Sequence, residues 1–369
     1  MQQKSTDKPA PLPRRQFIKG TLAATATAAV AAPAIVSSKA RTRWQMVTAW
    51  PRNFPGLGTG ANALANLITE MSGGRLEVQV FGAGELVGAF EIFDVVSRGT
   101  ADMGHGASYY WKGKHPATQF FSAVPFGLTA QEMNAWIYQG GGYELWQKLY
   151  AQFDLIPGAA GNTGTQMGGW FNKEIHKVED LQGLKMRMPG LGGEVLKRAG
   201  GTPVNIPGGE IFAALQAGTI DATEWVGPYN DLAFGLYKAA KYYYYPGWHE
   251  PGTTLECFVS RKSFEKLPKD LQSIVLNAIR VANLNMLSDF TARNNAALEI
   301  LVNKHKVSLR RYPDEVLAKL KTLSDEVVAE IALEDPLSKE VYDSFRRFRD
   351  QAVAWNRVSE QAYVNARQV

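Results

Sequence analysis

The sequence predicts an α/β protein built from two similar lobes, with a ligand cleft between them and a long helix at the C-terminal end. Three observations support this fold class. Strand and helix periodicities alternate over residues 44–104, the alternation recurs over 168–225, and helical spacing dominates from Ser263 onward. With 369 residues, of which 45% are hydrophobic and 20% charged, the chain is long enough for two domains of ordinary size.

The elements of the first half follow from apolar periodicity and from the positions of glycine and proline. We expect strands at 44–50, 76–81 and 101–104 and helices at 61–71 and 89–97. Residues 51–60 contain three glycines and two prolines, which predicts a loop between the first strand and the first helix. This order of strands and helices predicts a parallel sheet covered by helices.

The second half repeats the pattern before the chain becomes helical. We expect strands at 168–171, 185–188 and 221–225 and helices at 192–200, 209–218 and 270–305. The last segment, 341–362, has an apolar stripe at helical steps, which consists of Val341, Phe345, Phe348, Ala352, Trp355, Val358 and Ala362. Ligands of open α/β sheets bind at the carboxyl ends of strands, so the residues at strand ends are the candidates for function.

Residues 1–40 are similar to a twin-arginine export signal. Arg14 and Arg15 precede a short and weakly apolar run, 21–32, which is too mild for a transmembrane helix. Cleavage after Ala34 and cleavage after Ala40 both fit the small-residue rule, and a disordered basic N-terminus is the alternative. No other stretch approaches 18 apolar residues, so we expect a soluble protein in the periplasm after removal of the signal peptide.

The net charge of +5 belongs to this leader and not to the body of the protein. Six of the 40 basic residues and one of the 35 acidic residues lie in 1–40, which leaves 34 of each. A nearly neutral body with mixed charge gives no reason to expect nucleic-acid binding.

Several chemistries are excluded by the residues that are missing. A single cysteine, Cys257, excludes a disulfide framework and cysteine-based metal centres. The five histidines form no His-x-x-x-His pair, so a zinc hydrolase is not expected and the histidines are interpreted as ordinary residues. The string Gly56-Leu-Gly58 formally begins a dinucleotide fingerprint, but prolines separate it from the preceding strand, so no organic cofactor is expected.

A few polar residues at expected strand ends remain as candidates. Arg187 closes an apolar strand before a proline, where a guanidinium is either part of a buried ion pair or a fork for a ligand carboxylate. Glu224 and Trp225 end the strand 221–225, and Glu250 follows the aromatic run 242–248. Each acid alone is also consistent with an exposed loop that serves solubility.

These landmarks resemble the solute-binding subunits of TRAP (tripartite ATP-independent periplasmic) transporters. The resemblance covers nearly the whole mature chain and is carried by the motifs at 81–86, 95–103, 181–189, 201–203 and 210–222. Within that family, Glu224-Trp225, the Tyr-rich segment with Trp248-His-Glu250 and the long C-terminal helix look like the branch that binds 2-oxo acids or lactate.

The resemblance implies a periplasmic-binding-protein-like fold and a receptor, not an enzyme. Such a receptor captures a small monocarboxylate, a 2-oxo acid such as pyruvate or lactate, and delivers it to the TRAP membrane permease. The alternative from another class is a twin-arginine-exported oxidoreductase or lyase that acts on a small organic acid.

The resemblance also implies roles for individual residues. Arg187 would pair with the ligand carboxylate, and one bound cation beside it would be held by the side-chain oxygen of Gln166, Glu224, the backbone carbonyl of Trp225, and Glu250. Gln166 and Trp225 would also contact the substrate. We expect the aromatic residues Tyr109, Tyr110 and Phe54 to close over it.

The identity of the cation stays open between sodium and calcium. All donors are hard oxygen atoms, which suit either ion and not a transition metal. Two carboxylates, one guanidinium and a monocarboxylate ligand carry a net charge of −2, so calcium would neutralise the site, whereas the resemblance to 2-oxo acid receptors favours sodium.

The expected domain organisation follows the two halves. It comprises a signal peptide at 1–40, lobe I at 41–164 plus 253–293, lobe II at 165–252 plus 294–335, and a C-terminal helix at 336–369. A long helix with an exposed apolar stripe predicts a homodimer, and family members with exchanged helices point the same way. The alternative is a monomer in which this helix packs along its own lobes.

Overall fold

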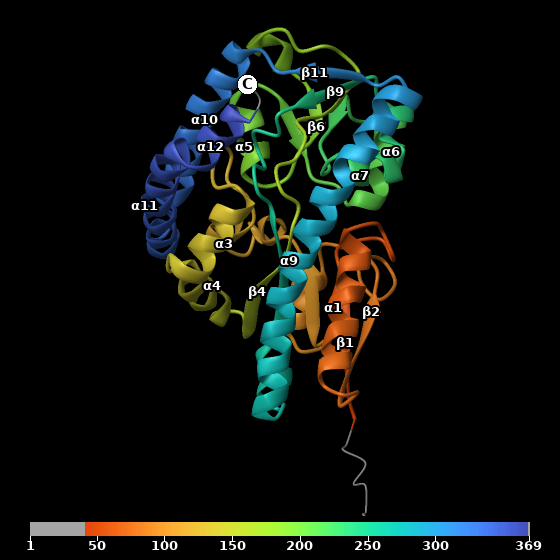
Figure 1. The fold of residues 1–369 in the computed structure, drawn as a ribbon, viewed down its shortest axis with the longest axis vertical. Helices are drawn as coiled ribbons and strands as arrows, with labels where there is room; N and C mark the ends of the chain where they lie inside the picture. Colours follow the sequence, from red (N-terminus) through yellow and green to blue (C-terminus); the bar gives the residue numbers. More distant parts are fainter. Residues whose placement is uncertain (1–40, 368–369) are drawn as a thin grey trace, which may run out of the picture. The chain divides into compact units, whose positions relative to one another are not determined.

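Two β-sheets organise the part of the chain that the computed structural model describes, residues 41–367 (Figure 1). The first sheet has the order β2-β1-β3-β10-β4. Its strands are β1 (Thr42–Thr48), β2 (Leu76–Phe81), β3 (Met103–Gly106), β4 (Leu155–Asn162) and β10 (Thr254–Ser260). Strand β1 runs parallel to β2 and β3, whereas β10 runs antiparallel to β3 and β4.

The second sheet has the order β11-β9-β5-β8-β6-β7. Its strands are β5 (Gly169–Phe171), β6 (Lys185–Arg187), β7 (Thr202–Val204), β8 (Ala222–Thr223), β9 (Tyr242–Tyr245) and β11 (Ser308–Arg311). Strands β7, β6 and β8 are parallel, and β5 is antiparallel to both β8 and β9. Both sheets are therefore mixed.

Helices of very different length connect and cover these strands. The α-helices are α1 (Leu57–Met71), α2 (Ile92–Ser97), α3 (Ala130–Gln139), α4 (Gly142–Ala151), α5 (Gly190–Arg198), α6 (Gly208–Gln216), α7 (Pro228–Phe234), α8 (Arg261–Glu265), α9 (Lys269–Glu299), α10 (Asp314–Ala332), α11 (Pro336–Val358) and α12 (Glu360–Ala366). Short helical turns are η1 (Ser108–Trp111), η2 (Pro116–Phe121), η3 (Val178–Leu181), η4 (Leu236–Lys238) and η5 (Ile300–Lys304). In this part of the chain, none of the helices combines the length and apolar character that a membrane crossing needs.

One face of the first sheet is covered by α1 and α9, as Figure 1 shows. Met46 of β1, Leu64 and Ile68 of α1 and Ile279 of α9 belong to one buried apolar cluster. Gly158 in β4 allows the close approach of α9, because a Cβ atom there would lie 2.8 Å from Ile279 Cγ2. Of the apolar residues at helical spacing in this helix, Leu64 and Ile68 are buried, whereas Met71 at its end is 43% exposed.

The structure corrects several expected elements. The expected parallel sheet is mixed because it also contains β10 and β4, which periodicity did not predict. Strand β10 lies between β3 and the edge strand β4 and is antiparallel to both. Every residue of both strands is buried, so neither has the alternation that reveals a half-exposed strand. Helix α1 begins at Leu57, inside the expected loop 51–60, and β11 interrupts the helical C-terminal region.

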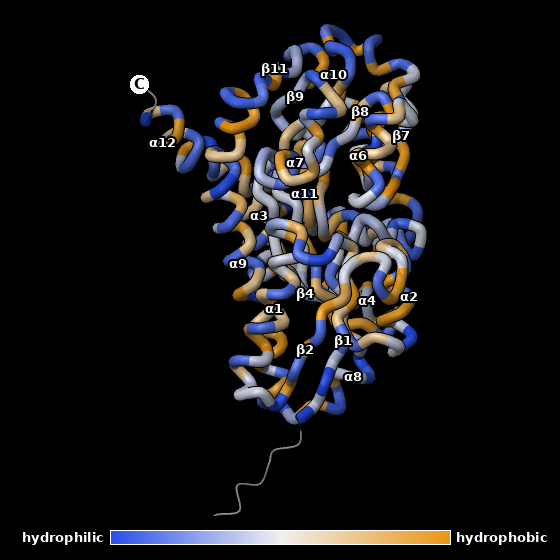
Figure 2. Tube along the Cα trace, turned by 90° about the vertical axis from the view of Figure 1, so that its right-hand side faces the viewer, coloured by the Kyte–Doolittle hydropathy of each residue, from blue (hydrophilic) through white to orange (hydrophobic). Residues whose placement is uncertain are grey.

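The C-terminal helix divides into a packed and an exposed part. Val341 and Phe345 of α11 are buried, and Phe345 lies edge-on to Trp136 of α3 with 5.2 Å between ring centres. Further along, the side chains of Trp355 and Val358 are 70% and 73% exposed. The helix then breaks at Ser359, and α12 extends beyond its neighbours with no buried residue (Figure 2). The first part thus packs on its own chain, whereas the second part leaves its large apolar side chains exposed.

Candidate functional site

Strand directions bring four polar residues to one edge of the second sheet. Arg187 ends β6 and Glu224 follows the parallel strand β8, so the amide of Glu224 donates to the carbonyl of Arg187 at 3.1 Å. Strand β5 is antiparallel to β8, which places Gln166, just before β5, at the same edge. Glu250 follows β9, which is antiparallel to β5, and its carbonyl accepts from the amide of Gln166 at 3.1 Å.

Arg187 and Glu224 form a buried ion pair at this edge. Nη1 of Arg187 donates to Oε1 of Glu224, Nη2 donates to the hydroxyl of Tyr110 at 3.3 Å, and the guanidinium lies 5.1 Å from the ring centre of Trp225. Burial alone would lower the pKa of Arg187, but Glu224, the two tyrosines 109 and 110 and Glu250 together outweigh it, so the pKa is raised. Of the two alternatives for Arg187, the structure contains the buried ion pair, with one edge of the guanidinium turned toward Tyr110.

Glu250 is held by neutral donors. The side-chain amide of Gln166 donates to its Oε2 at 2.8 Å and the hydroxyl of Thr253 donates to the same oxygen at 2.5 Å. Burial raises the pKa of Glu250 to about 7, and the nearby charge of Glu224 adds to that increase. The pKa of Glu224 is also raised to about 7, by burial that its pairing with Arg187 only partly offsets.

Two acceptor oxygens in this group are buried without a donor. Oε1 of Gln166 and Oε2 of Glu224 have no hydrogen-bond partner within residues 41–367. Buried oxygens without partners are costly unless something positive binds them. Carboxylate, amide and carbonyl oxygens are the donors that sodium and calcium prefer. The expected set of Gln166, Glu224, the Trp225 carbonyl and Glu250 therefore fits a cation of this class.

A small cavity adjoins these groups and is closed by aromatic side chains. It is lined by Trp50, Leu57, Tyr109, Tyr110, Thr163, Gln166, Trp225, Val226, Thr253 and Leu255. It offers about 10 Å³ to the centres of water molecules, which is room for about one water. The carboxyl ends of β1, β3 and β4 supply Trp50, the tyrosines and Thr163, so the first sheet contributes most of this wall.

Trp50 presents only its apolar ring to the cavity. Its indole Nε1 donates to Nδ1 of the buried His105 at 2.8 Å, and this is the only donor that an indole has. The ring centre of Trp50 lies 6.3 Å from those of Tyr110 and Trp225. The wall from the first sheet therefore suits an apolar ligand tail.

The structure brings most of the predicted residues together, with one exception. Tyr109, Tyr110, Gln166 and Trp225 line the cavity. Phe54 does not line it but packs behind Trp225, with ring centres 6.2 Å apart.

Sequence reasoning missed several residues of this site. Trp50, Leu57, Thr163, Val226, Thr253 and Leu255 line the cavity, and His249 lies beside the carboxylates. Trp50 and Thr163 follow strands, so the strand-end rule could have found them, whereas Leu57 gives no such signal. Burial lowers the pKa of His249 to about 4, so its imidazole is neutral.

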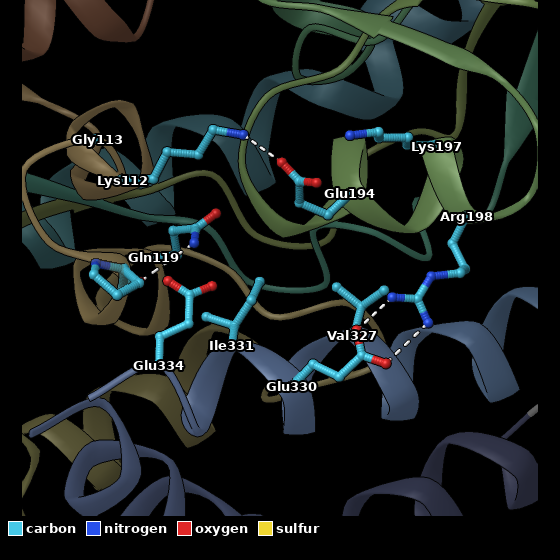
Figure 3. Close-up of a pocket in the computed structure, with 11 residues that line it drawn as sticks. Lys112, Gly113, Gln119, Glu194, Lys197, Arg198, Val327, Glu330, Ile331 and Glu334 are labelled. Carbon is cyan, nitrogen blue, oxygen red and sulfur yellow. Dashed lines mark hydrogen bonds and ion pairs between the residues drawn. The ribbon is translucent and has the colours of Figure 1, made fainter. Parts of the chain in front are cut away.

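A larger hollow lies between η1, α5 and α10 (Figure 3). It has a volume of about 860 Å³ and is lined by six charged side chains, Lys112, Lys197, Arg198, Glu194, Glu330 and Glu334. Lys112 pairs with Glu194 at 2.7 Å, and Arg198 pairs with Glu330. Because opposite charges are balanced and largely paired with each other, this hollow shows no preference for a charged ligand. The smaller cavity at the strand ends is the candidate site.

Two sheets meet with their strand ends at a small cavity that is lined by aromatic and neutral polar groups and adjoined by buried charged groups, an arrangement typical of a solute-binding protein. The chain belongs to the bacterial extracellular solute-binding proteins of family 7, whose model matches residues 46–335, and a twin-arginine translocation signal matches residues 11–31. It is thus a periplasmic solute-binding protein, as the sequence predicted, and the oxidoreductase or lyase alternative is not favoured.

Individual relatives agree with this assignment. The chain is 45% identical to a monocarboxylate 2-oxoacid-binding periplasmic protein of Nostoc sp., over 95% of this chain and 98% of that protein. A TRAP periplasmic solute-binding protein of Pseudoalteromonas atlantica has been solved with bound sodium and pyruvate. It is 44% identical to this chain with a TM-score of 0.86, and the match covers 88% of this chain and 99% of that protein's chain. A TRAP solute-binding protein of Bordetella bronchiseptica is described as a mixed occupancy dimer with calcium and picolinate. It is 37% identical to this chain with a TM-score of 0.87, and the match covers 89% of this chain and 97% of that protein's chain.

Proposed function

We propose that this protein captures a small 2-oxo monocarboxylate such as pyruvate, together with one sodium or calcium ion, and delivers it to a TRAP membrane permease. The buried acceptor oxygens of Gln166 and Glu224 carry the proposal, because they adjoin both a guanidinium and an apolar cavity wall. Relatives at 45% and 44% identity bind 2-oxo monocarboxylates, and lactate is the closest chemical alternative.

The proposed roles follow from charge and direction. A ligand carboxylate at Arg187 has to share the guanidinium with Glu224, so two negative groups meet at one cation. A metal ion on the free Oε2 of Glu224, on Gln166, on Glu250 and on the Trp225 carbonyl relieves this repulsion. Trp50 and Leu57 then face the alkyl end of the ligand, and Tyr109 and Tyr110 close over it.

Charge counting makes both ions compatible with the site. Arg187, Glu224 and Glu250 sum to −1 and a bound monocarboxylate makes −2, so sodium leaves −1 and calcium leaves zero. Relatives have been solved with either ion. We propose that the cation is required for tight ligand binding.

Calorimetric titration tests this requirement directly. Chelated and desalted protein in sodium-free buffer is titrated with pyruvate and with lactate, with and without sodium or calcium. We expect pyruvate binding only with a cation, and we expect Glu250→Gln to lose it. The exposed Glu179→Gln is the matched control and is expected to bind as the unaltered protein does. Unchanged affinity after verified removal of the cation would show that the cation assignment is wrong.

We also propose that the two sheets mark the two lobes with the boundaries expected from the sequence. Strands of the first sheet lie within 42–162 and 254–260, and those of the second lie within 169–245 and 308–311. These ranges support lobe I at 41–164 plus 253–293 and lobe II at 165–252 plus 294–335.

We propose that the protein forms a homodimer through the exposed second part of its C-terminal helix. Trp355 and Val358 of α11 are 70% and 73% exposed, Tyr363 of α12 is 66% exposed, and exposed apolar side chains of this size indicate an interface. The dimeric Bordetella relative supports the proposal. Because Val341 and Phe345 already pack on their own chain, the interface is confined to the second part.

Light scattering on the mature protein tests the dimer. We expect a dimer at micromolar concentration and a monomer after Trp355→Ser with Val358→Ser, both of which leave the packed part of α11 intact. Leu284→Ser on α9 is the control, because this leucine is 64% exposed and lies on another helix. A monomeric unaltered protein would contradict the proposal.

A further inference from the structure

His249 is a buried imidazole that the proposed binding scheme does not use. It lies in the turn between β9 and β10, directly before Glu250, and it is 1% exposed. Neither ring nitrogen has a hydrogen-bond partner in the described part of the chain. A neutral imidazole carries one donor and one acceptor, so both capacities are unused here.

The ring faces the carboxylates of the cation site. Its Nε2 lies 3.6 Å from Oε2 of Glu224, which is the carboxylate oxygen that Arg187 leaves free. One donor atom each of Glu224, His249 and Glu250 lies within 4.8 Å of the other two. An ion that bonds its donors at about 2.0–2.4 Å spans such separations.

The side chain of His249 packs against α5 and Trp248 on the sides away from the carboxylates. The Cβ atom of His249 packs so closely on Gly192 of α5 that a Cβ atom on Gly192 would lie 2.9 Å from it. Trp248 covers another side of the ring, with ring centres 5.4 Å apart. These contacts hold the base of the side chain against α5, and the ring extends from there toward Glu224.

A nitrogen donor changes which ions the site accepts. Sodium and calcium take oxygen donors, whereas imidazole favours zinc, nickel and cobalt. Zinc binds imidazole nitrogen and carboxylate oxygen in other proteins, and a site with three protein ligands is completed by water or substrate.

We propose that His249 makes this a mixed oxygen and nitrogen site, which binds a divalent transition ion such as zinc in competition with sodium or calcium. The inference rests on the proposed function, because it uses Glu224 and Glu250 of the same cation site. It goes beyond the all-oxygen set expected from the sequence, which excluded a transition metal.

Competition with a chromophoric zinc indicator tests the proposal on chelated, full-length mature protein without carboxylate ligand. We expect one zinc ion per chain, displaced by excess calcium. In His249→Gln the ratio of zinc affinity to calcium affinity should fall about tenfold or more. The control His176→Gln removes a 75% exposed imidazole near Glu174 and is expected to leave that ratio unchanged. A ratio that is unchanged in His249→Gln would overturn the proposal.

Cobalt provides a second measurement that does not depend on a variant. Proton NMR of the cobalt-loaded, unaltered protein should show one strongly shifted imidazole N–H signal, which is absent when calcium occupies the site. Absence of a shifted imidazole signal at full cobalt occupancy would also overturn the proposal. Pyruvate binding that needs no cation would instead contradict the proposed function, so the two failures are distinguishable.

Discussion

Glu256 is predicted to make the folded protein less stable as the pH rises. It is fully buried in β10, between β3 and β4 of the first sheet. Its carboxylate accepts hydrogen bonds from the indole of Trp111 at 2.5 Å and from the hydroxyl of Tyr150 at 2.6 Å. None of the groups that shift the pKa of Glu256 is a cation. Burial raises that pKa to about 8, although both hydrogen bonds oppose the increase.

The magnitude follows from the difference between the folded and unfolded states. The unfolded carboxyl loses its proton near its ordinary pKa of 4.5, whereas the folded one keeps it up to about pH 8. Between these values the folded state binds more protons, so the free energy of unfolding falls as the pH rises. At about 1.4 kcal/mol for each pH unit, this one group lowers stability by about 3 kcal/mol between pH 5 and pH 7.

Urea unfolding of the unaltered protein and of Glu256→Gln at pH 5, 7 and 8.5 measures this contribution. The amide still accepts from Trp111 and offers a donor to Tyr150, and it does not titrate. We expect the free energy of unfolding of the variant, relative to that of the unaltered protein, to increase by about 3 kcal/mol from pH 5 to pH 7. Other titrating groups cancel in this difference. A difference between the two proteins that stays constant with pH would refute the reasoning.

Three further predictions concern the site and the C-terminal helix. Arg187→Lys replaces a bidentate fork by a point charge and should weaken pyruvate binding by about 2–5 kcal/mol in calorimetry, so affinity retained within about threefold would remove Arg187 from the site. Leu57→Ala enlarges the cavity wall and should raise the affinity for a five-carbon 2-oxo acid relative to pyruvate by about tenfold, whereas an unchanged ratio would place Leu57 outside the ligand contact. Phe345→Ala should lower the free energy of unfolding by about 3–5 kcal/mol because this ring is buried against Trp136, and a loss below about 1 kcal/mol would show that α11 contributes little packing.

Much of the fold could be predicted because half-exposed elements carry periodic patterns. Strand β2 has the expected bounds 76–81, and α5 and α6 lie within two residues of their expected bounds. Strands β4 and β10 could not be found in this way, since complete burial removes the alternation. Their antiparallel pairing depends on contacts between residues about 100 positions apart.

The charged residues of the site could be predicted because they lie near expected strand ends and within motifs that resemble those of the family. Arg187 ends β6 and Glu224 directly follows β8, whereas Glu250 lies in the connection between β9 and β10 after the aromatic run. The apolar wall depends on the first sheet meeting the second, so Leu57 and Leu255 resemble ordinary core residues in the sequence. His249 was interpreted as ordinary because no second histidine stands at metal-binding spacing, and only the fold brings it to Glu224.

The division of the cavity between the two sheets has a kinetic consequence. The second sheet supplies the guanidinium and both carboxylates, whereas most of the apolar wall comes from the first. Charged groups govern how fast an anion is captured and how strongly salt slows that capture, whereas packed apolar contacts govern how long it stays. Substitutions at the strand ends of the second sheet should therefore change the association rate and its salt dependence. Substitutions at Trp50 or Leu57 should shorten the residence time, which is the interval within which the permease has to be met.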